Sequence, residues 1–317
     1  MARREWQWTE TQEFRAEQVK EIAEDLRAYW PLTLRQIHYQ LVARLIAWSP
    51  NGTERIYRNT RSEYNMLSKL LKWMRIDGMI PWRVMVDDHR SREEMLKYET
   101  VNEFIDDELA HFLTGYRRCL IQDQPKYIEV WVEKGALRRI CKDVAWEYCL
   151  PVVSCTGYQS VTYLENFAYK AHRAISKGKD PVVLYVGDLD PSGVQMFEAN
   201  IETLEDEMDV VGAEFHRIAL NPDQVAAYNL PSDPDAGKTT DPRYWGYVQR
   251  YGETFVELDA LHPSDLQKIL RTAIESHLDM EVFKAQEDEE RFDDALIDEL
   301  QRDIGELIET RFRRVFD

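Results

Sequence analysis

The sequence predicts an α/β protein whose N-terminal part is helical and whose C-terminal part contains a parallel sheet. In residues 9–90, apolar residues recur mainly at the spacing of amphipathic helices. From residue 127 onward, short runs rich in β-branched residues alternate with helical segments. Strands that are apolar along their whole length are typical of a parallel sheet covered by helices on both faces.

The N-terminal part is expected to contain three helices. The first covers about 9–29, the second begins after Thr33, a suitable N-cap, and the third covers about 61–77 with Gly78 at its end. The following MIPWRVMVDDHR is expected to form a short strand and a turn. Helix, helix, basic helix and strand pair is the order of a winged helix, a common DNA-binding unit, but a generic helical subdomain fits this pattern equally well.

The C-terminal part is expected to alternate between strands and helices. The expected order is strand 127–132, helix 135–148, strand 151–155, helix 159–177, strand 181–186, helix 192–208 and strand 214–220. A further strand, 254–261, precedes a helix at 263–278, and the proline-rich segment 221–253 is expected to be a long ordered loop or lid. The domains are therefore expected at 1–115, including a helical linker from 91, and at 116–280, followed by a charged helical segment at 281–317.

The 317 residues carry a formal net charge of −18, which by itself argues against a nucleic-acid partner. The charge is uneven, because Lys and Arg outnumber Asp and Glu within residues 27–92 and are strongly outnumbered after residue 100. A basic segment in an acidic protein is a candidate surface for phosphates, although an ordinary solvated face would look the same. The candidate contacts to double-stranded DNA lie on the polar sides of the third helix: Arg61, Lys69, Lys72 and Arg75.

No feature of the sequence indicates a membrane or secreted protein. No apolar run approaches the roughly 18 residues of a membrane helix, and the N-terminus lacks the apolar core of a secretory signal. The four cysteines have no CxxC spacing, so we expect free thiols in a reducing compartment and no zinc site. We therefore expect a cytoplasmic protein, associated with the nucleoid if it binds DNA.

Acidic residues follow two of the expected strands. Glu133 comes directly after the first strand, and Asp188 and Asp190 follow the third, two residues apart, so that both point to one side of an extended chain. Ligands of open parallel sheets bind at the carboxyl ends of the strands, and Mg²⁺ prefers carboxylate oxygens. The pattern predicts a metal site. Alternatively, the two aspartates cap the next helix and Glu133 is a solvated loop residue. Lys134 could pair with Glu133 or contact a phosphate.

The segments VEKGA at 132–136 and GDLDPSG at 187–193 resemble the two motifs of a Toprim domain, a Rossmann-like fold of topoisomerases, primases and nucleases. The DxDPxG form is especially similar to the A subunit of topoisomerase VI and its meiotic double-strand-break relatives. The resemblance covers about 125–280. It implies that Glu133, Asp188 and Asp190 bind Mg²⁺, or Mn²⁺, beside the scissile phosphate. Glu257 and Asp259 would assist this site, or serve only as structural acids at a strand end.

A candidate nucleophile lies in the second helix. On a helical wheel, Tyr39 lies off the apolar stripe and beside Arg35, although a half-buried packing role fits the same pattern. RQIHY at 35–39 resembles the segment that carries the attacking tyrosine in topoisomerase VI A subunits, with His38 in place of the usual aromatic residue. The resemblance implies that Tyr39 becomes 5′-phosphotyrosyl linked, so Tyr39, Arg35 and Glu133 are the expected catalytic residues.

Three functions follow from these patterns. The first is a topoisomerase-like DNA transesterase that cuts through Tyr39, the second a Toprim endonuclease in which water attacks, and the third a DNA binder with a degenerate Toprim domain. The chain has no P-loop, so no ATP site is expected, and it is similar to the stand-alone A-subunit-like proteins called Mini-A. The resemblance implies a homodimer, in which Tyr39 of one protomer faces the acids of the other, and leaves room for a separate regulatory or ATPase partner.

Overall fold

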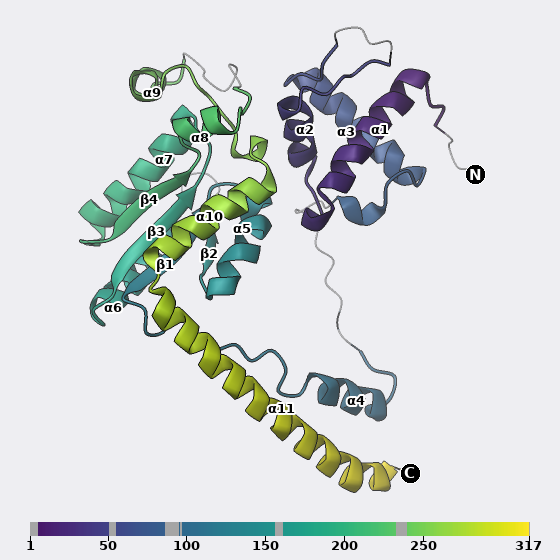
Figure 1. The fold of residues 1–317 in the computed structure, drawn as a ribbon, viewed down its shortest axis with the longest axis vertical. Coiled ribbons are helices and arrows are strands. Elements are labelled where there is room, and N and C mark those ends of the chain that lie inside the picture. Colours follow the sequence, from purple (N-terminus) through teal and green to yellow (C-terminus); the bar gives the residue numbers. More distant parts are fainter. Residues whose placement is uncertain are drawn as a thin grey trace. The chain divides into compact units, whose positions relative to one another are not determined.

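The computed structural model describes residues 6–50, 55–85, 95, 97–155, 161–232 and 240–316. Their contacts define two compact units. The first unit contains residues 1–89 and 126–276, and the second contains residues 90–125 and 277–317. The first unit has the expected α/β composition, with a helical N-terminal part followed by a parallel sheet (Figure 1).

The N-terminal part is built from three α-helices and short 3-10 helices. The α-helices are α1, Glu10–Asp25, α2, Leu34–Ala43, and α3, Arg61–Ile76. Each begins after a threonine whose hydroxyl accepts a backbone hydrogen bond, at Thr9, Thr33 and Thr60. The expected N-cap at Thr33 is therefore confirmed. The apolar faces of the helices share one core, in which Leu41 and Leu67 are fully buried.

The segment after α3 differs from the expected short strand. Residues Trp82–Val84 form a 3-10 helix, closed by a hydrogen bond from the Val84 amide to the Pro81 carbonyl at 3.1 Å. Pro81 has a φ of −63° that suits the start of such a turn. Met85 then makes a single bridge to Leu32. The rest of the expected strand and turn lies outside the described residues, so the winged helix stays a prediction.

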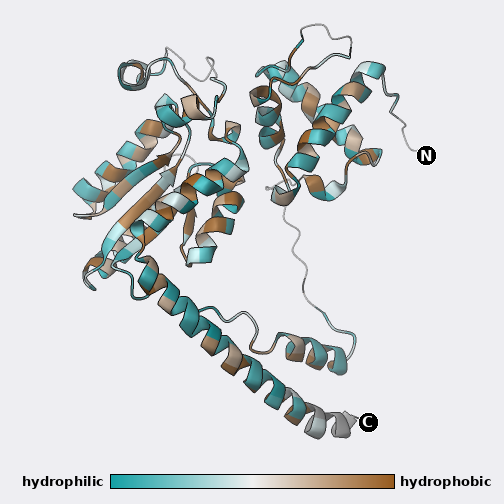
Figure 2. Ribbon diagram, viewed as in Figure 1, coloured by the Kyte–Doolittle hydropathy of each residue, from teal (hydrophilic) through white to brown (hydrophobic). Residues whose placement is uncertain are grey.

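Four parallel strands form the sheet within the described residues. They are β1, Lys126–Val132, β2, Val152–Ser154, β3, Asp180–Val186, and β4, Glu214–Ala219, in the spatial order β2-β1-β3-β4. The four strands that we predicted between residues 127 and 220 are confirmed to within one residue at each end. The central strands β1 and β3 are mostly hydrophobic (Figure 2), because both faces of the sheet are covered.

Helices cover both faces of the sheet (Figure 1). Their bounds are α5, Arg138–Ala145, α6, Val161–Ile175, α7, Pro191–Glu202, and α10, Pro263–His277. On one face, Tyr185 of β3 packs with Phe167 of α6 and Phe197 of α7. On the other face, α5 contacts β1 and β2, and a hydrogen bond from the Gln267 side chain to the Ile140 carbonyl places α10 beside α5.

The strand that we expected at 254–261 is not formed. Val256 makes only an isolated antiparallel bridge to Leu189, and Leu258–Ala260 is a 3-10 helix. The reason is a long-range contact, because the Leu258 amide donates to the Asp188 carboxylate at 2.7 Å and is therefore unavailable to a strand ladder. The short 3-10 helix contacts α2.

The segment 221–253, expected as a long loop, contains two short helices. These are α8, Pro222–Ala227, and α9, Tyr244–Tyr251. Residues 233–239 lie outside the described part of the chain. The α9 helix is attached to the segment between β3 and α7, because the Tyr247 hydroxyl donates to the Leu189 carbonyl at 2.9 Å.

The second unit consists of α4, Val101–His111, the segment after it, and the long helix α11, Met280–Phe316. The helical character that was expected at 280–317 is confirmed. Arg118 binds α11 through its Nη1 atom, 2.7 Å from Asp293 Oδ2. The helix is mostly hydrophilic (Figure 2). Among the described helices, none is both long enough and apolar enough to cross a membrane.

Candidate functional site

The acids that follow β1 and β3 leave the sheet at the same edge. Val132 and Val186 are register partners, and the Glu133 amide donates to the Val186 carbonyl at 2.9 Å. Glu133 and the Gly187–Asp188 segment therefore begin at the same level. Parallel strands in register have this consequence, and it underlies the sequence-based prediction of a shared site.

The Glu133 side chain lies against the loop that carries the two aspartates. Its Oε2 atom accepts a hydrogen bond from the Asp188 amide at 2.8 Å and from the Tyr185 hydroxyl at 3.1 Å. A Cβ atom at Gly187 would lie 2.5 Å from this oxygen, and one at Gly193 would lie 2.9 Å from it. The Tyr185 ring is nearly as close to the Gly187 position, and the Asp188 carbonyl oxygen is closer still to the Gly193 position, so a larger residue at either glycine would force its neighbours to shift.

The surroundings of Glu133 raise the pKa of its carboxyl group. Burial has the largest effect, because it disfavours the charged form, and the Asp190 carboxylate adds to it. The hydrogen bond from the Asp188 amide and the charges of Lys134 and Arg217 act in the opposite direction without cancelling the shift. Glu133 is therefore a carboxylate that a nearby cation would stabilise.

The two aspartates have different roles in the structure. Asp190 is the N-cap of α7, and its Oδ1 atom accepts hydrogen bonds from the Gly193 amide at 2.7 Å and the Ser192 hydroxyl at 2.8 Å. The capping role that we considered as an alternative thus describes Asp190. Asp188 does not cap the helix. It is only 6% exposed, and burial raises the pKa of its carboxyl group well above the usual range.

Lys134 faces three acids, none of which is the Glu133 that we expected as its partner. Its Nζ atom lies 2.9 Å from Asp188 Oδ1 and 3.0 Å from Asp259 Oδ2, and it also forms an ion pair with Glu257. Burial alone would lower the pKa of Lys134, but the charges of Asp259, Asp188 and Glu257 raise it above its usual value. We call Asp188, Glu257 and Asp259, with Lys134 between them, the acidic cluster.

Arg35 joins the acidic cluster from α2. Its Nη2 atom lies 2.6 Å from Glu257 Oε2, and its Nε atom lies 3.5 Å from Asp259 Oδ2. Burial opposes its charge, but Glu257 and Asp259 outweigh this effect and raise the pKa of Arg35. The guanidinium carbon also lies 5.8 Å from the centre of the Tyr39 ring. Arg35 therefore lies between Tyr39 and the acids of its own chain, whereas the resemblance implied acids of another protomer.

Tyr39 is more buried than its position on the helical wheel indicated, with 6% of the residue exposed. The neighbouring His38 packs edge-on against the Tyr39 ring. It also forms hydrogen bonds, because its Nδ1 atom lies 2.6 Å from the Tyr57 hydroxyl and its Nε2 atom 2.9 Å from Asn59 Oδ1. His38 thus connects Tyr39 to Tyr57 and Asn59 in the core of the N-terminal part.

The basic residues of α3 lie at its surface. Arg61, Lys69 and Lys72 are exposed, and Arg75 is partly buried. Glu63, which is the single acid in the helix sequence, is buried and paired with Arg55 at 2.8 Å. Aromatic rings also lie on this surface, which the sequence pattern did not predict. Three of its cations lie over an aromatic ring: Lys69 over Trp6, Lys72 over Trp73 and Arg75 over Trp82, at 5.0, 5.5 and 5.2 Å from the ring centres.

Sequence reasoning missed one residue that shapes the site, Arg217 on β4. Its Nη2 atom donates to the Gly187 carbonyl at 3.1 Å and to the Asp188 carbonyl, and its Nε atom donates to the Leu220 carbonyl at 3.1 Å. Arg217 therefore holds the loop between β3 and α7 in place. A charged residue inside the apolar run EFHRIAL was the signal that could have revealed it.

The donor atoms of Glu133, Asp188 and Asp190 suit a hard divalent cation. Their oxygens do not all lie within 4.8 Å of one another, and Asp188 Oδ1 contacts Lys134. The acidic cluster nevertheless has unused capacity. Asp259 is 2% exposed, and its Oδ1 atom has no hydrogen-bond partner. A buried carboxylate oxygen without a partner fits a site that receives a cation or water.

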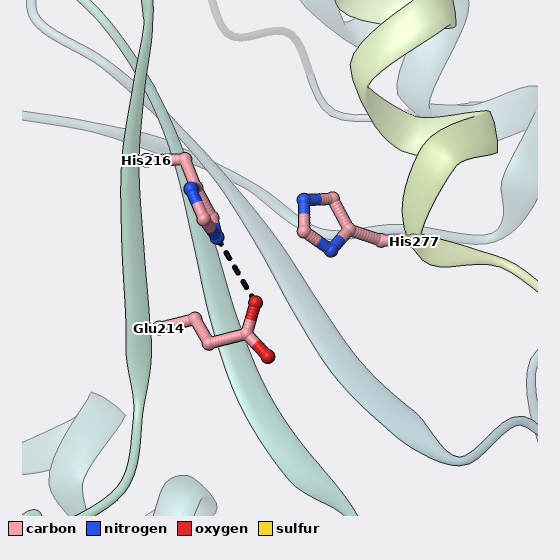
Figure 3. Close-up of side chains that lie close together, drawn as sticks. All are labelled: Glu214, His216 and His277. Atoms are coloured by element: carbon pink, nitrogen blue, oxygen red, sulfur yellow. Dashed lines mark hydrogen bonds and ion pairs between the residues drawn. The ribbon is translucent and has the colours of Figure 1, made fainter.

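A different acid and histidine pair lies on β4, where His216 Nε2 is 3.0 Å from Glu214 Oε2 (Figure 3). His277, which is also drawn there, belongs to the second unit, so we assign no metal site to these three residues.

Comparisons with protein-family models, curated proteins and solved structures found no match to this chain.

Proposed function

We propose that this protein cleaves DNA in a reaction that depends on Mg²⁺, with Tyr39 as the nucleophile. The observation that carries the proposal is the contact of Arg35 with Glu257 and Asp259. It joins the helix of the candidate nucleophile to the acids at the end of the sheet within one chain. The resemblance of RQIHY, VEKGA and GDLDPSG to topoisomerase VI A subunits points to the same pair of elements.

The exposed basic residues of α3 support DNA as the substrate. Lys69 and Lys72 are exposed, and the only acid of the helix is buried and neutralised by Arg55. The chain as a whole has a net charge of −18, so a surface with this bias is where a polyanion would bind with the least repulsion. Phosphate contacts of this kind supply affinity without reading the base sequence.

Glu133, Asp188 and Asp190 would hold the metal ion. When bound, Mg²⁺ would neutralise charge on the phosphoryl and leaving oxygens of the bond that is cut. The Lys134 ammonium already pairs with Asp188. When the metal ion binds, this ammonium would either move away from Asp188 or stay bound to the carboxylate together with the ion. The raised pKa of Glu133 and Asp188 fits this role, because an added cation would compensate carboxylates that burial now disfavours.

The proposed step is a transesterification. The Tyr39 oxygen forms a bond to phosphorus, the bond from phosphorus to the 3′ oxygen breaks, and the phenolic proton is transferred in net terms to that leaving oxygen. One strand end then carries a free 3′ hydroxyl, and the other is joined to Tyr39 through its 5′ phosphate. Arg35, beside the ring, would stabilise the phenolate as the proton leaves.

One observation favours a second candidate, a nuclease of the same metal site in which water attacks. The 6% exposure of Tyr39 leaves its ring little access to a bound strand unless α2 moves. In this case Tyr39 is a packing residue, and both strand ends would be free after cleavage. The products distinguish the two candidates because only the tyrosine reaction leaves protein attached to DNA.

The test is to incubate the protein with end-labelled duplex DNA and Mg²⁺, denature it, and look for protein attached to 5′ ends. Tyr39→Phe should abolish attachment. Tyr64→Phe is the matched control, because this phenol also interacts electrostatically with Arg35 but lies on α3. Cleavage to free 5′ phosphates that survives in Tyr39→Phe would establish the nuclease. No cleavage with Mg²⁺ or Mn²⁺ would refute both candidates.

A further inference from the structure

A cavity of about 380 Å³ lies between α7 and α9, and its lining begins at Pro191, the residue after Asp190. Pro191 and Val194 of α7 form one wall, and Gly246 and Tyr251 of α9 belong to the other. This volume is within the range of small-molecule pockets, which extends upward from about 300 Å³. Neither the metal site nor the basic residues of α3 contribute to it, so the functions considered above leave it unexplained.

The cavity is attached directly to the loop that carries the candidate metal ligands. Pro191 follows Asp190 in the chain and lines the cavity. On the other side, the Tyr247 hydroxyl lies 2.9 Å from the Leu189 carbonyl oxygen and 2.5 Å from the Thr254 carbonyl oxygen, and shares its one proton between them. A ligand in the cavity would therefore lie beside the residues that flank the site of cleavage.

Two arginines give the cavity its chemistry. Arg243 and Arg250 both line it, and each is paired with an acid, Asp241 at 2.7 Å and Glu198 at 2.5 Å respectively. The side chain of Arg250 is 54% exposed, and that of Glu198 is 39% exposed. An ion pair so accessible to water contributes little to stability, so an incoming phosphate can replace the carboxylate at small cost.

The cavity also has surfaces that suit a base. The Tyr251 ring lies 5.1 Å from the Arg250 guanidinium carbon, and Pro191 and Val194 supply apolar contacts. Arginine beside a tyrosine ring and an apolar wall is the combination that binds a phosphate and an aromatic ring together. A simple inorganic anion would use only the arginines, and a purely apolar ligand would leave them without a role.

We propose that this cavity binds one nucleotide unit, with its phosphate at Arg250 and its base against Tyr251. The inference rests on the proposed function for its biological meaning, since a nucleotide here would belong to the strand next to the cut bond. The same chemistry would also hold a free nucleotide, so the test includes both sources.

Gly246→Phe tests the cavity without touching an acid or an arginine. A Cβ atom at Gly246 would have no neighbouring atom within 4 Å, so the new ring can enter the cavity without displacing backbone. The matched control is Gly305→Phe, at a helical glycine of α11 with equally open surroundings. Both variants replace a glycine inside a helix, so neither is expected to lose stability.

The probes are thymidine 5′-monophosphate and a short single-stranded oligonucleotide, titrated by calorimetry in EDTA. We expect Gly305→Phe to bind each probe with the same affinity as the unmodified protein. We expect Gly246→Phe to bind at least one of the two probes about tenfold more weakly than the unmodified protein does. Loss confined to the oligonucleotide identifies a DNA strand as the source, and loss confined to the monophosphate identifies a free nucleotide. Unchanged binding of both probes by Gly246→Phe would overturn the proposal.

Two charge variants should move monophosphate binding in opposite directions. Arg250→Gln removes the phosphate contact and should weaken binding, whereas Glu198→Gln frees Arg250 from its partner and should tighten it, each by about three- to tenfold. Changes in the same direction would rule out the assigned phosphate contact.

These titrations contain no metal and require no cleavage, so they separate the two proposals. Nucleotide binding that Gly246→Phe weakens, in a protein that never cuts DNA, would support the cavity and refute the proposed function. DNA cleavage combined with unaltered probe binding in Gly246→Phe would support the proposed function and refute the nucleotide site in the cavity.

Discussion

Arg35 and Glu257 are 222 positions apart in the sequence, yet the Arg35 Nη2 atom lies 2.6 Å from Glu257 Oε2. This contact attaches the helix that carries Tyr39 to the acids beyond the sheet. Glu257 itself is held on the other side by Lys134. Burial alone would raise the pKa of Glu257, but these two cations outweigh it and lower the pKa, which keeps the carboxylate charged.

The first prediction concerns this link. Replacing Arg35 with Met should reduce DNA cleavage by about tenfold or more, because α2 loses its attachment and Tyr39 its neighbouring cation. The control is Arg44→Met, which breaks a more exposed pair with Asp25 just after the same helix. Initial cleavage rates on duplex DNA measure both. Equal losses in the two variants would show that Arg35 matters only for the stability of α2.

The second prediction concerns Lys134. Lys134→Met leaves the buried acids Asp188 and Asp259 without their shared cation, which should destabilise the metal-free protein by about 3 kcal/mol. Mg²⁺ should raise the melting temperature of this variant more than that of the unmodified protein, because the ion replaces the lost charge. Lys126→Met, which breaks the more exposed pair with Glu214, is the control. An identical Mg²⁺ effect in all three proteins would exclude the acidic cluster as a cation site.

The third prediction concerns Gly193. In Gly193→Ala the added Cβ would lie 2.7 Å from the Asp188 carbonyl oxygen and 2.9 Å from Glu133 Oε2, so we expect a loss of about 1–3 kcal/mol in the free energy of unfolding. Gly246→Ala is the matched control, and there the open space should allow a gain of about 0.5–1 kcal/mol. Urea denaturation measures both. A neutral Gly193→Ala would mean that both the Asp188 carbonyl and the Glu133 side chain can shift without cost.

The fourth prediction concerns the pH dependence of stability. Burial raises the pKa of Glu133 in the folded state, so the folded protein holds this proton more tightly than the unfolded chain does. The resulting stabilisation is fully present below the ordinary Glu pKa of about 4.3 and is lost as the pH rises through the higher folded value. Glu133→Gln has no carboxyl group to titrate at this position, so its free energy of unfolding should not fall in this way as the pH rises.

Urea denaturation in EDTA at several pH values measures this effect. The stability of Glu133→Gln relative to the unmodified protein should increase as the pH rises, and Mg²⁺ should reverse the trend, since only the carboxylate can bind the ion. A constant difference between the two proteins across the pH range would contradict the raised pKa of Glu133.

The fifth prediction concerns the surface of α3. Replacing Lys69, Lys72 and Arg75 with Gln should weaken DNA binding on all sequences and reduce the salt dependence of the logarithm of affinity by about 2–3 units of slope. The control replaces three cations elsewhere in the chain, Arg173, Lys177 and Lys268. The change in net charge is the same, so an equal effect of both triple variants would indicate long-range electrostatics and not a contact on α3.

Most of the secondary structure could be predicted because it depends on local patterns. The runs of β-branched residues predicted β1 and β3, and Thr33 predicted the start of α2. The equal level of Glu133 and Asp188 also followed, since parallel strands of similar length end at the same edge.

The rest depended on contacts between distant residues, which periodicity does not report. The strand expected at 254–261 is absent because Asp188 accepts a hydrogen bond from the Leu258 amide. Two of the three acids paired with Lys134, Glu257 and Asp259, lie more than 120 positions later in the chain. Tyr39 is buried although the wheel placed it off the apolar stripe, and His38 and Arg35 both lie against its ring.

The position of Arg35 has a thermodynamic consequence for the two proposed ligands. A DNA phosphate that draws the Arg35 guanidinium away would leave the acidic cluster with less positive charge, and would thereby increase the affinity of Asp188, the proposed metal ligand in that cluster, for a divalent cation. Linkage is reciprocal, so a cation at these acids would release Arg35 toward DNA by the same factor. DNA and metal ion would then load cooperatively, which would limit cutting to moments when the substrate is already bound.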